Sequence, residues 1–291
     1  MRAFMNYRGA IFTSLFVYFF ISSSAPVFSK EVIPFGFCPK YDLQTMHQLY
    51  QPFIRYLNDN TPYQFEMKLP HFYQDTIEIL IRGETPIASC GAIPYIKARE
   101  KYKVIPILRT LNKDGNPYYR STIITRKDSP IRNLQDLKGR SFAFAQEWST
   151  AGHILPRYHL LKSGISLKDL KHYAFLRNHD FVVEEVLNRE FDAGAVKDIV
   201  AQKYQGKGLR FIYIPNPIPT VPIVVRADAP KEMVRSVKAA LLRLNPKNLG
   251  HQEIMAKWDD EFKYGFIEAE DSDYNPIRKI LDLFEKETGI K

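Results

Sequence analysis

The strongest constraint on the fold is an alternation of short apolar strands with helical segments that begins at Val32. Residues 32–37 form an apolar run, residues 46–57 repeat apolar side chains at helical spacing, and residues 63–69 alternate apolar and polar side chains. These patterns predict a strand, a helix that Pro52 kinks or shortens, and a second strand. Strands that alternate with helices favour an α/β fold in which helices cover both faces of a mostly parallel sheet.

The remaining elements continue this alternation. A helix over 72–82 is expected to end at Gly83, because glycine tolerates the backbone that stops a helix. The other expected strands are 87–90, 104–108, 121–125, 141–145, 173–176, 193–196, 209–214 and 223–225, and the other expected helices are 95–101, 133–137, 151–162, 180–189 and 198–204, with two more after Pro230 and Pro276.

Two extended segments divide the chain into two lobes. The turn cluster 113–117 precedes the first segment, and the proline-rich stretch 215–222 precedes the second. We therefore expect crossings near 119–125 and 218–226, with lobe 1 formed by residues 30–120 and 222–291 and lobe 2 by residues 121–221. Ligands of open parallel sheets bind outside the carboxyl ends of the strands, so both lobes should turn those ends toward a shared cleft that closes on a hinge.

Four predicted helix starts carry hydroxyl and imidazole groups. They are at Tyr73, at Tyr95, in the run 148–153, and at the pair His179-Asp180. A helix start has backbone N–H groups without internal partners and a partial positive charge. Several such starts around one cleft predict a binding site for a phosphate-like anion.

The run Ser149-Thr150-Ala151-Gly152 offers more than a helix cap needs. One hydroxyl is enough to cap a helix, whereas this run has two hydroxyls and a glycine that lets backbone approach a ligand. Asp180 is expected to cap the next helix, which leaves His179 at the mouth of the cleft. The alternatives are that the hydroxyls only cap, that the histidine is structural, and that the tyrosines only pack.

The first 29 residues have the layout of a secretory signal. Arg2 and Arg8 precede an apolar stretch over 11–21, and small residues follow it. We expect cleavage after Ser29 and export to the periplasm; the alternative is a membrane anchor, for which the stretch is short of the roughly 20 residues that a span needs.

Charge and cysteine content exclude several functional classes. The formal net charge of +9 falls to +7 when the two arginines of the signal are removed. Acids are interspersed among the bases, which argues against a nucleic-acid groove. Cys38 and Cys90 each end a predicted strand in an oxidising compartment, so they are expected either as a disulfide near the cleft floor or as two buried thiols. The histidines and cysteines lack tight ligand spacing, so neither a metal nor a cofactor is expected.

An enzyme is a weaker interpretation. Ser149, His179 and either Asp180 or Asp192 would make a hydrolytic triad. No Gly-x-Ser-x-Gly elbow is present in the sequence, and an adjacent His-Asp pair places the carboxylate poorly to orient the ring. Walker and dinucleotide motifs are also absent from the sequence.

Short motifs spread over nearly the whole mature chain become recognisable together: Phe35–Pro39, Phe72–Tyr73, Gly91–Tyr95, Leu134–Phe144, Ser149–Gly152, Asn178–Asp180 and Phe191–Val196. With them the chain resembles periplasmic substrate-binding proteins of the phosphate, phosphite and phosphonate class, which serve ABC transporters. The Ser-Thr-x-Gly and His-Asp combination is the specific part of this resemblance. It implies a two-lobed, type II-like binding protein that is monomeric and works with a permease in the inner membrane.

The resemblance also implies a ligand set. In similar proteins two tyrosines, a Ser-Thr pair and a histidine hold the phosphorus-bound oxygens, and these carry over to Tyr73, Tyr95, Ser149, Thr150 and His179. Ala151 stands where similar proteins usually have a hydroxyl, although its backbone and that of Gly152 remain beside the site.

Val221 stands where an acid is usual, just before the Pro-Ile-Val of the return crossing, which argues against a ligand with an ammonium group. Asp198 is expected either as a replacement acceptor or as a cap of its own helix. The sequence leaves open which oxyanion is bound.

The function that follows is capture of a small oxyanion by uncharged donors and its delivery to a permease. Neutral donors select by shape and by the count of hydrogen bonds, whereas a buried lysine attracts any anion and costs desolvation. The alternative is a sensory module of the same fold that docks on a membrane receptor.

Overall fold

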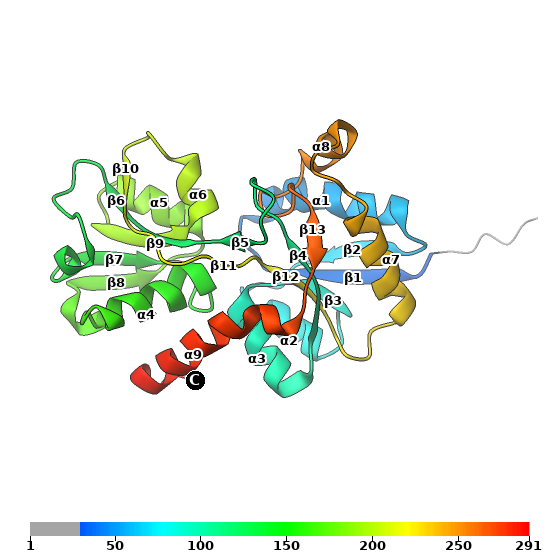
Figure 1. Cartoon of the computed structure of the whole chain (residues 1–291), viewed down its shortest axis with the longest axis horizontal. Helices are drawn as coiled ribbons and strands as arrows, with labels where there is room; N and C mark the ends of the chain where they lie inside the picture. The colour runs from blue at the N-terminus through cyan, green and yellow to red at the C-terminus, as the bar shows by residue number, and fades with distance from the viewer. Residues whose placement is uncertain (1–29, 291) are drawn as a thin grey trace, which may run out of the picture.

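The computed structural model describes residues 30–290. The predicted signal and its cleavage point after Ser29 lie outside these residues. Figure 1 shows two α/β lobes side by side, joined by extended segments, as the alternation of strands and helices predicted. Among residues 30–290, no helix has the length and apolar character to cross a bilayer.

Lobe 1 is built on a six-stranded sheet in the order β13-β4-β12-β3-β1-β2. Its strands are β1 (Val32–Phe37), β2 (Gln64–Lys68), β3 (Ile87–Ser89), β4 (Ile105–Thr110), β12 (Pro222–Val225) and β13 (Phe266–Glu268). Its helices are α1 (Leu43–Asn60), α2 (Asp75–Ile81), α3 (Ala92–Tyr102), α7 (Lys231–Leu242), α8 (Leu249–Met255) and α9 (Asn275–Thr288). The sequence patterns did not predict α8 or β13.

Helix α1 shows how local signals and burial combine. The Asp42 carboxylate accepts the Thr45 N–H at 3.0 Å and caps the helix. Its apolar side chains pack on an aromatic core that includes Phe35, where Phe53 lies edge-on with ring centroids 5.7 Å apart. The helix continues past Pro52 for all of its 18 residues, so the expected shortening is wrong because packing on the sheet outweighs one lost hydrogen bond.

Lobe 2 is built on a five-stranded sheet in the order β10-β6-β9-β7-β8. Its strands are β6 (Ser121–Arg126), β7 (Ser141–Phe144), β8 (His172–Phe175), β9 (Ala193–Lys197) and β10 (Leu209–Tyr213). Its helices are the π-helix η2 (Thr150–Ile154), α4 (Leu155–Lys162), α5 (His179–Leu187) and α6 (Asp198–Lys203), with short 3-10 turns η1 (Leu134–Leu137) and η3 (Leu167–Asp169).

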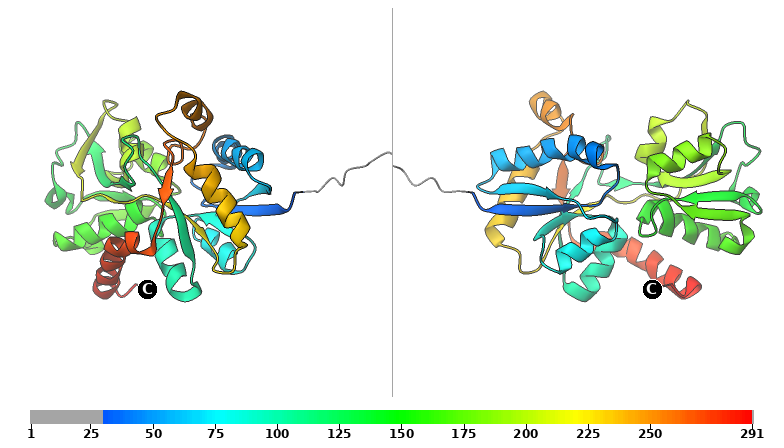
Figure 2. Two further views of the ribbon diagram at one scale, coloured as in Figure 1. Left: turned by 45° about the vertical axis from the view of Figure 1, so that its right-hand side comes forward. Right: turned by 180° about the vertical axis from the view of Figure 1, so that it is seen from behind.

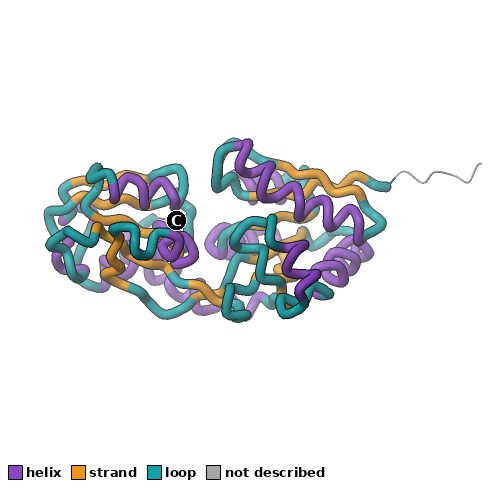
Figure 3. The backbone as a smooth tube through the Cα atoms, turned by 90° about the horizontal axis from the view of Figure 1, so that it is seen from above, coloured by secondary structure: helices purple, strands orange, loops and turns teal. Residues whose placement is uncertain are grey.

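The two crossings pair with each other between the lobes. β5 (Tyr118–Tyr119) and β11 (Ile218–Pro219) form a two-stranded antiparallel ribbon, which lies between the sheets in Figure 1 and at the lower edge of Figure 3. The chain then returns as β12, which inserts antiparallel between β3 and β4. Both sheets are therefore mixed, because crossing strands enter them against the direction of the parallel pairs.

Helix α9 makes a further connection between the lobes. It follows η4 (Asp271–Tyr274) and contacts both α3 of lobe 1 and α4 of lobe 2 (Figure 2). Lys97 of α3 pairs with Glu285 at 2.8 Å, and Arg157 of α4 lies over the Phe284 ring at 5.2 Å. The contacts of α9 thus help to fix how lobe 1 faces lobe 2.

The two cysteines are buried thiols. β1 and β3 are neighbours in register at Phe37 and Ser89, which brings Cys38 and Cys90 near each other, as expected. Both are free thiols, and the Cys38 Sγ lies 3.8 Å from the Tyr73 carbonyl oxygen. Burial raises the pKa of both thiols. The thiol alternative therefore replaces the disulfide.

Candidate functional site

The loop after β7 positions Ser149 and Thr150 at a helix start. Ser149 caps η2, since its Oγ accepts the Gly152 N–H at 3.0 Å. The Gly152 carbonyl in turn accepts the Ala145 N–H at 2.9 Å, which ties the turn to the end of the β7 region. A Cβ on Gly152 would lie 2.4 Å from the Ala145 Cβ and 2.8 Å from the His179 ring, so only glycine fits here.

His179 begins helix α5 and faces Ser149. The helix is capped by Asn178, whose Oδ1 accepts the Phe181 N–H at 2.7 Å, so the expectation that Asp180 is the cap is wrong. His179 Nδ1 accepts the Lys197 N–H at 3.3 Å, which places the ring proton on Nε2. Nε2 lies 3.4 Å from Ser149 Oγ. The imidazole is therefore a neutral donor at the same point as the serine hydroxyl.

Lobe 1 meets this helix start through Tyr73 and Gly91. A methyl group built on Gly91 would lie 2.7 Å from the Tyr73 hydroxyl oxygen and 3.5 Å from Thr150 Oγ1, so these two oxygens converge from opposite lobes. Thr150 Oγ1 also accepts the Ile93 N–H at 3.1 Å, in the first turn of α3. The structure thus brings Tyr73, Ser149, Thr150 and His179 together.

Tyr95 does not join this group. Helix α3 begins at Ala92, three residues earlier than the sequence predicted, so Tyr95 lies a turn inside the helix. Its side chain is buried against Tyr274, with ring centroids 4.9 Å apart, and its hydroxyl donates to the Asp271 carboxylate. The tyrosine therefore packs in lobe 1, because its helical position points it away from Thr150.

Tyr119 of the crossing strand β5 is a tyrosine that sequence reasoning missed. It is 9% exposed, and burial raises its pKa while a hydrogen bond from Thr150 lowers it in part. The phenol thus stays protonated beside Thr150. Its only sequence signal was its position just after the turn cluster that ends at Pro117.

Three buried charged side chains lie next to the neutral donors. Lys40 and Lys197 both contact the Glu261 carboxylate, and the three side chains are 16%, 8% and 12% exposed. Burial opposes ionisation of Glu261, yet the two lysines lower its pKa. The sequence patterns did not predict this charged cluster beside the neutral donors. Lys40 follows β1 and Lys197 ends β9. Because ligands of open parallel sheets bind at the carboxyl ends of the strands, both lysines could have been predicted from their positions in the sequence.

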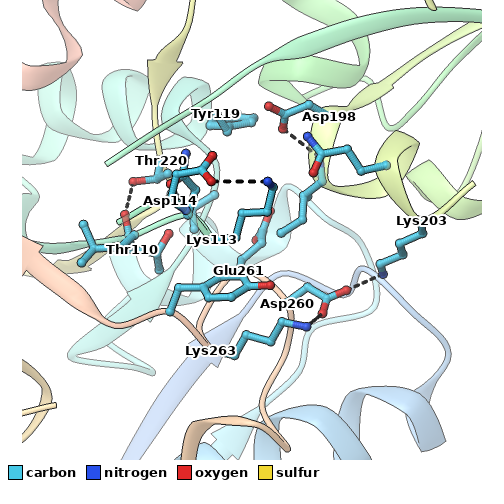
Figure 4. Close-up of a pocket in the computed structure, with 16 residues that line it drawn as sticks. Thr110, Lys113, Asp114, Tyr119, Asp198, Lys203, Thr220, Asp260, Glu261 and Lys263 are labelled. Atoms are coloured by element: carbon cyan, nitrogen blue, oxygen red, sulfur yellow. Dashed lines mark hydrogen bonds and ion pairs between the residues drawn. The ribbon is translucent and has the colours of Figure 1, made fainter. Parts of the chain in front are cut away.

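Two cavities are lined in part by this cluster, one by Glu261 and the other by Lys40. One of about 300 Å³ is lined by Tyr119, Val221, Glu261 and Asp198 (Figure 4). Another, of about 510 Å³, is lined by Tyr73 and residues near Lys40.

The remaining predicted site residues lie at the edges of the cluster. Both Asp198 oxygens accept backbone N–H groups, from Arg120 at 3.0 Å and Ile199 at 2.8 Å. Ala151 is fully buried in an apolar cluster that includes residues of both lobes, and its carbonyl accepts the Ser121 hydroxyl at 2.7 Å.

A hydrolytic triad does not form. In a triad a carboxylate would accept the proton of His179 Nδ1, but this nitrogen accepts the Lys197 N–H. The Asp192 carboxylate instead accepts from the backbone N–H and hydroxyl of Ser141 at 3.0 and 2.9 Å. Within residues 30–290, no group of three or more His, Cys, Asp or Glu has the arrangement of a metal site.

The environment of His179 predicts a pH dependence of stability. Burial, followed by the charges of Lys197 and Lys40, lowers its pKa from 6.5 to about 3. Between pH 6.5 and about 3 the unfolded chain binds a proton at His179 that the folded protein does not bind. The folded state is therefore destabilised progressively as pH falls below about 6.5, and this effect is absent well above that pH. Urea unfolding at pH 7.5 and 5.0 should show that His179→Gln reduces the pH-dependent loss by about 2 kcal/mol. Equal losses in both proteins would contradict this pKa.

Comparison with protein families gives one match that spans most of the chain. Residues 35–274 match the family described as "ABC transporter, phosphonate, periplasmic substrate-binding protein". The matched range includes both crossings and the residues that we call the donor cluster: Tyr73, Tyr119, Ser149, Thr150 and His179.

Similar proteins agree with this match. The chain is 27% identical over 231 residues to the phosphonates-binding periplasmic protein of Escherichia coli. This aligned region covers 75% of this chain and 68% of that protein. It is 23% identical over 276 residues to the phosphate-import protein PhnD of Mycolicibacterium smegmatis, covering 87% and 86%. The solved structure of PhnD1 from Prochlorococcus marinus in complex with methylphosphonate shares the fold, with a TM-score of 0.77 and 21% identity, covering 88% of this chain and 99% of that chain.

Proposed function

The chain belongs to the family of periplasmic substrate-binding proteins of phosphonate ABC transporters, and from this we propose that its interlobe cleft binds a small oxyanion of the phosphonate, phosphite or phosphate type. As a member of that family, the protein is exported and captures a solute for an ABC transporter. The observation that carries the ligand class is the meeting of the Tyr73 hydroxyl of lobe 1 with the Thr150 hydroxyl of lobe 2 at Gly91. Thr150 is next along the chain from Ser149, which lies beside the His179 imidazole.

The protonation of the donors suits an oxyanion. Burial raises the pKa of the Tyr73 and Tyr119 phenols, so both keep a proton to donate. His179 is neutral and donates from Nε2. Ser149 and Thr150 each accept a backbone N–H through the side-chain oxygen, which leaves the Ser149 hydroxyl proton for a ligand and the Thr150 hydroxyl proton for Tyr119. Four donors, Tyr73, Tyr119, Ser149 and His179, match an acceptor-rich ligand.

Tyr119 is proposed in the place that the sequence gave to Tyr95. Tyr119 lies on the crossing strand β5, so a ligand between Tyr119 and Ser149 would contact a segment that joins the two lobes. Ala151 contributes only backbone, and Val221 lines the adjoining cavity with an apolar surface. Both features favour a compact ligand over one with an ammonium group.

The organisation around the cleft completes the proposal. Residues 30–120 with 222–291 and residues 121–221 would move as two lobes about crossings near 119–125 and 218–226. The mature chain would begin at Lys30 and act as a monomer that delivers its ligand to a permease in the inner membrane. Since members of the family are transport proteins, transport is favoured over sensing.

A thermal-shift screen of the purified mature protein tests the ligand class. The panel is phosphate, phosphite, hypophosphite, methylphosphonate, aminoethylphosphonate and sulfate. A phosphorus oxyanion at 100 times its dissociation constant should stabilise the fold by about 2.7 kcal/mol, which raises Tm by about 5–10 °C. If no phosphorus oxyanion raises Tm, the proposal fails.

A further inference from the structure

The ion cluster at the centre of the cleft joins both lobes. Lys40 follows β1 and Glu261 lies between α8 and β13, both in lobe 1, whereas Lys197 ends β9 of lobe 2. Lys197 contacts Glu261 Oε1 and Lys40 contacts Oε2, so one carboxylate is held between two ammonium groups. Trp258 and Phe262, both fully buried in the core of lobe 1, anchor the segment that carries Glu261.

This cluster is continuous with the neutral donors. The Lys197 backbone N–H binds His179, and the Lys197 ammonium lies 5.4 Å from the centre of the Tyr119 ring. A small hollow of about 20 Å³ is lined by Lys40, His179, Lys197 and Glu261 together. A group attached to an anion at Ser149 and Tyr119 would therefore meet the two lysines across a short distance.

Charge compensation differs for the two lysines. Lys40 also lies 3.7 Å from Asp259; burial lowers its pKa, but Glu261, Asp259 and Tyr41 together raise it more. Lys197, by contrast, is compensated by Glu261 across the cleft. When the lobes part or Glu261 turns aside, the buried charge of Lys197 needs another anion, because an unpaired buried ammonium is costly.

We propose that Lys40 and Lys197 form a second anionic subsite, which Glu261 occupies in the empty cleft, and that the ligand carries a carboxylate or similar acid group close to its phosphorus-bound oxygens. This inference rests on the proposed function. Each ammonium has three donors, so the pair that holds the Glu261 carboxylate can hold that of a ligand in exchange.

The acids around the cavity argue against an amine in the same place. Asp198 accepts two backbone N–H groups, and Asp260 pairs with Lys203 at 2.7 Å and also with Lys263. Glu261 is held by both lysines of the subsite. An ammonium group would thus find carboxylates that are already engaged and two cations close by.

Calorimetry with two matched ligands tests the subsite. Phosphonoacetate and 2-oxopropylphosphonate have the same number of non-hydrogen atoms and nearly the same shape, but only the first carries a carboxylate. The wild-type protein should bind phosphonoacetate at least tenfold more tightly, and Lys197→Gln should remove most of this preference. Lys162→Gln is the matched control, since Lys162 of α4 also pairs across the lobes, with Glu287 of α9, and lines neither the hollow nor the cavities beside it, so this variant should keep the preference.

The variant Glu261→Gln distinguishes two roles of Glu261. In the first, exchange, a ligand carboxylate replaces Glu261 on the two lysines; in the second, a clasp, Glu261 only holds the lobes together. Exchange predicts severalfold tighter binding of phosphonoacetate, because the competing carboxylate is gone. A clasp predicts weaker binding of both ligands, which would overturn the inference. Lys197→Gln leaves Glu261 paired with Lys40, so this variant should fold and stays informative if Glu261→Gln does not.

Failure of this inference differs from failure of the proposed function. If 2-oxopropylphosphonate or methylphosphonate binds and phosphonoacetate has no advantage, the second subsite is wrong while the oxyanion site stands. If no phosphorus oxyanion binds at all, the proposed function itself fails and the subsite with it.

Discussion

Replacement of Gly152 by alanine is expected to remove about 3 kcal/mol of unfolding free energy and the ligand response together. The added Cβ would lie 2.4 Å from the Ala145 Cβ, 2.8 Å from the His179 ring and 2.9 Å from Ser149 Oγ. Contacts this short force the backbone or both side chains to move, and overpacking of buried positions costs about 1–3 kcal/mol. The same displacement separates the two donors that would hold the ligand.

Urea unfolding and thermal-shift measurements with a bound oxyanion check this expectation. Gly250→Ala is the control, because Gly250 lies in helix α8 and its added Cβ would come no closer than 3.4 Å to Asn248 Oδ1. Alanine there should leave stability equal or higher by up to about 1 kcal/mol. A Gly152→Ala protein with unchanged stability and ligand response would show that the turn at Ser149 is looser than its contacts indicate.

Replacement of both Ser149 and His179 by alanine is expected to abolish ligand-induced stabilisation. Each would make a hydrogen bond to a charged ligand, and such bonds contribute about 1.5–3 kcal/mol. Loss of both lowers affinity by at least about 100-fold, which removes the thermal shift at ligand concentrations that saturate the wild-type protein. The unliganded protein should unfold cooperatively, because neither side chain anchors the main apolar cores.

A matched double variant controls for general effects of the same substitutions. Ser272 and His47 are both exposed and lie in lobe 1, away from the Ser149 turn. Their replacement by alanine should leave the thermal shift intact. Full retention of the shift in the Ser149→Ala, His179→Ala protein would place the ligand elsewhere and would refute the donor cluster.

The predicted elements succeeded where local pattern and burial agree. The strand 32–37 has the predicted bounds, and the predicted strand 63–69 appears as β2 over Gln64–Lys68, because alternation and apolar runs report burial directly. The predicted helix starts were less accurate, because several neighbouring residues can each act as the cap of a helix. α3 begins at Ala92 because Gly91 is extended and Pro94 fits the first turn, which moved Tyr95 out of the site.

The donor cluster was predicted in part for the same reason. Ser149 and Thr150 are encoded by a strand, a short loop and a cap, all of which are local. The sequence predicted Asp180 as the cap of α5, whereas Asn178 is the cap. The His179 imidazole still lies beside Ser149, because both residues follow strands of the same sheet. Tyr119 was missed because it belongs to a crossing strand whose direction depends on both lobes.

The chain's own residues determined the alternation of elements, the two-lobed division and the chemistry of the helix starts, since these depend on neighbours within a few residues. Only the tertiary structure decided that β12 inserts between β3 and β4, that Cys38 stays a thiol, and that Glu261 lies between Lys40 and Lys197. These outcomes join segments up to 221 residues apart, and their geometry is set by how the lobes pack rather than by any local preference.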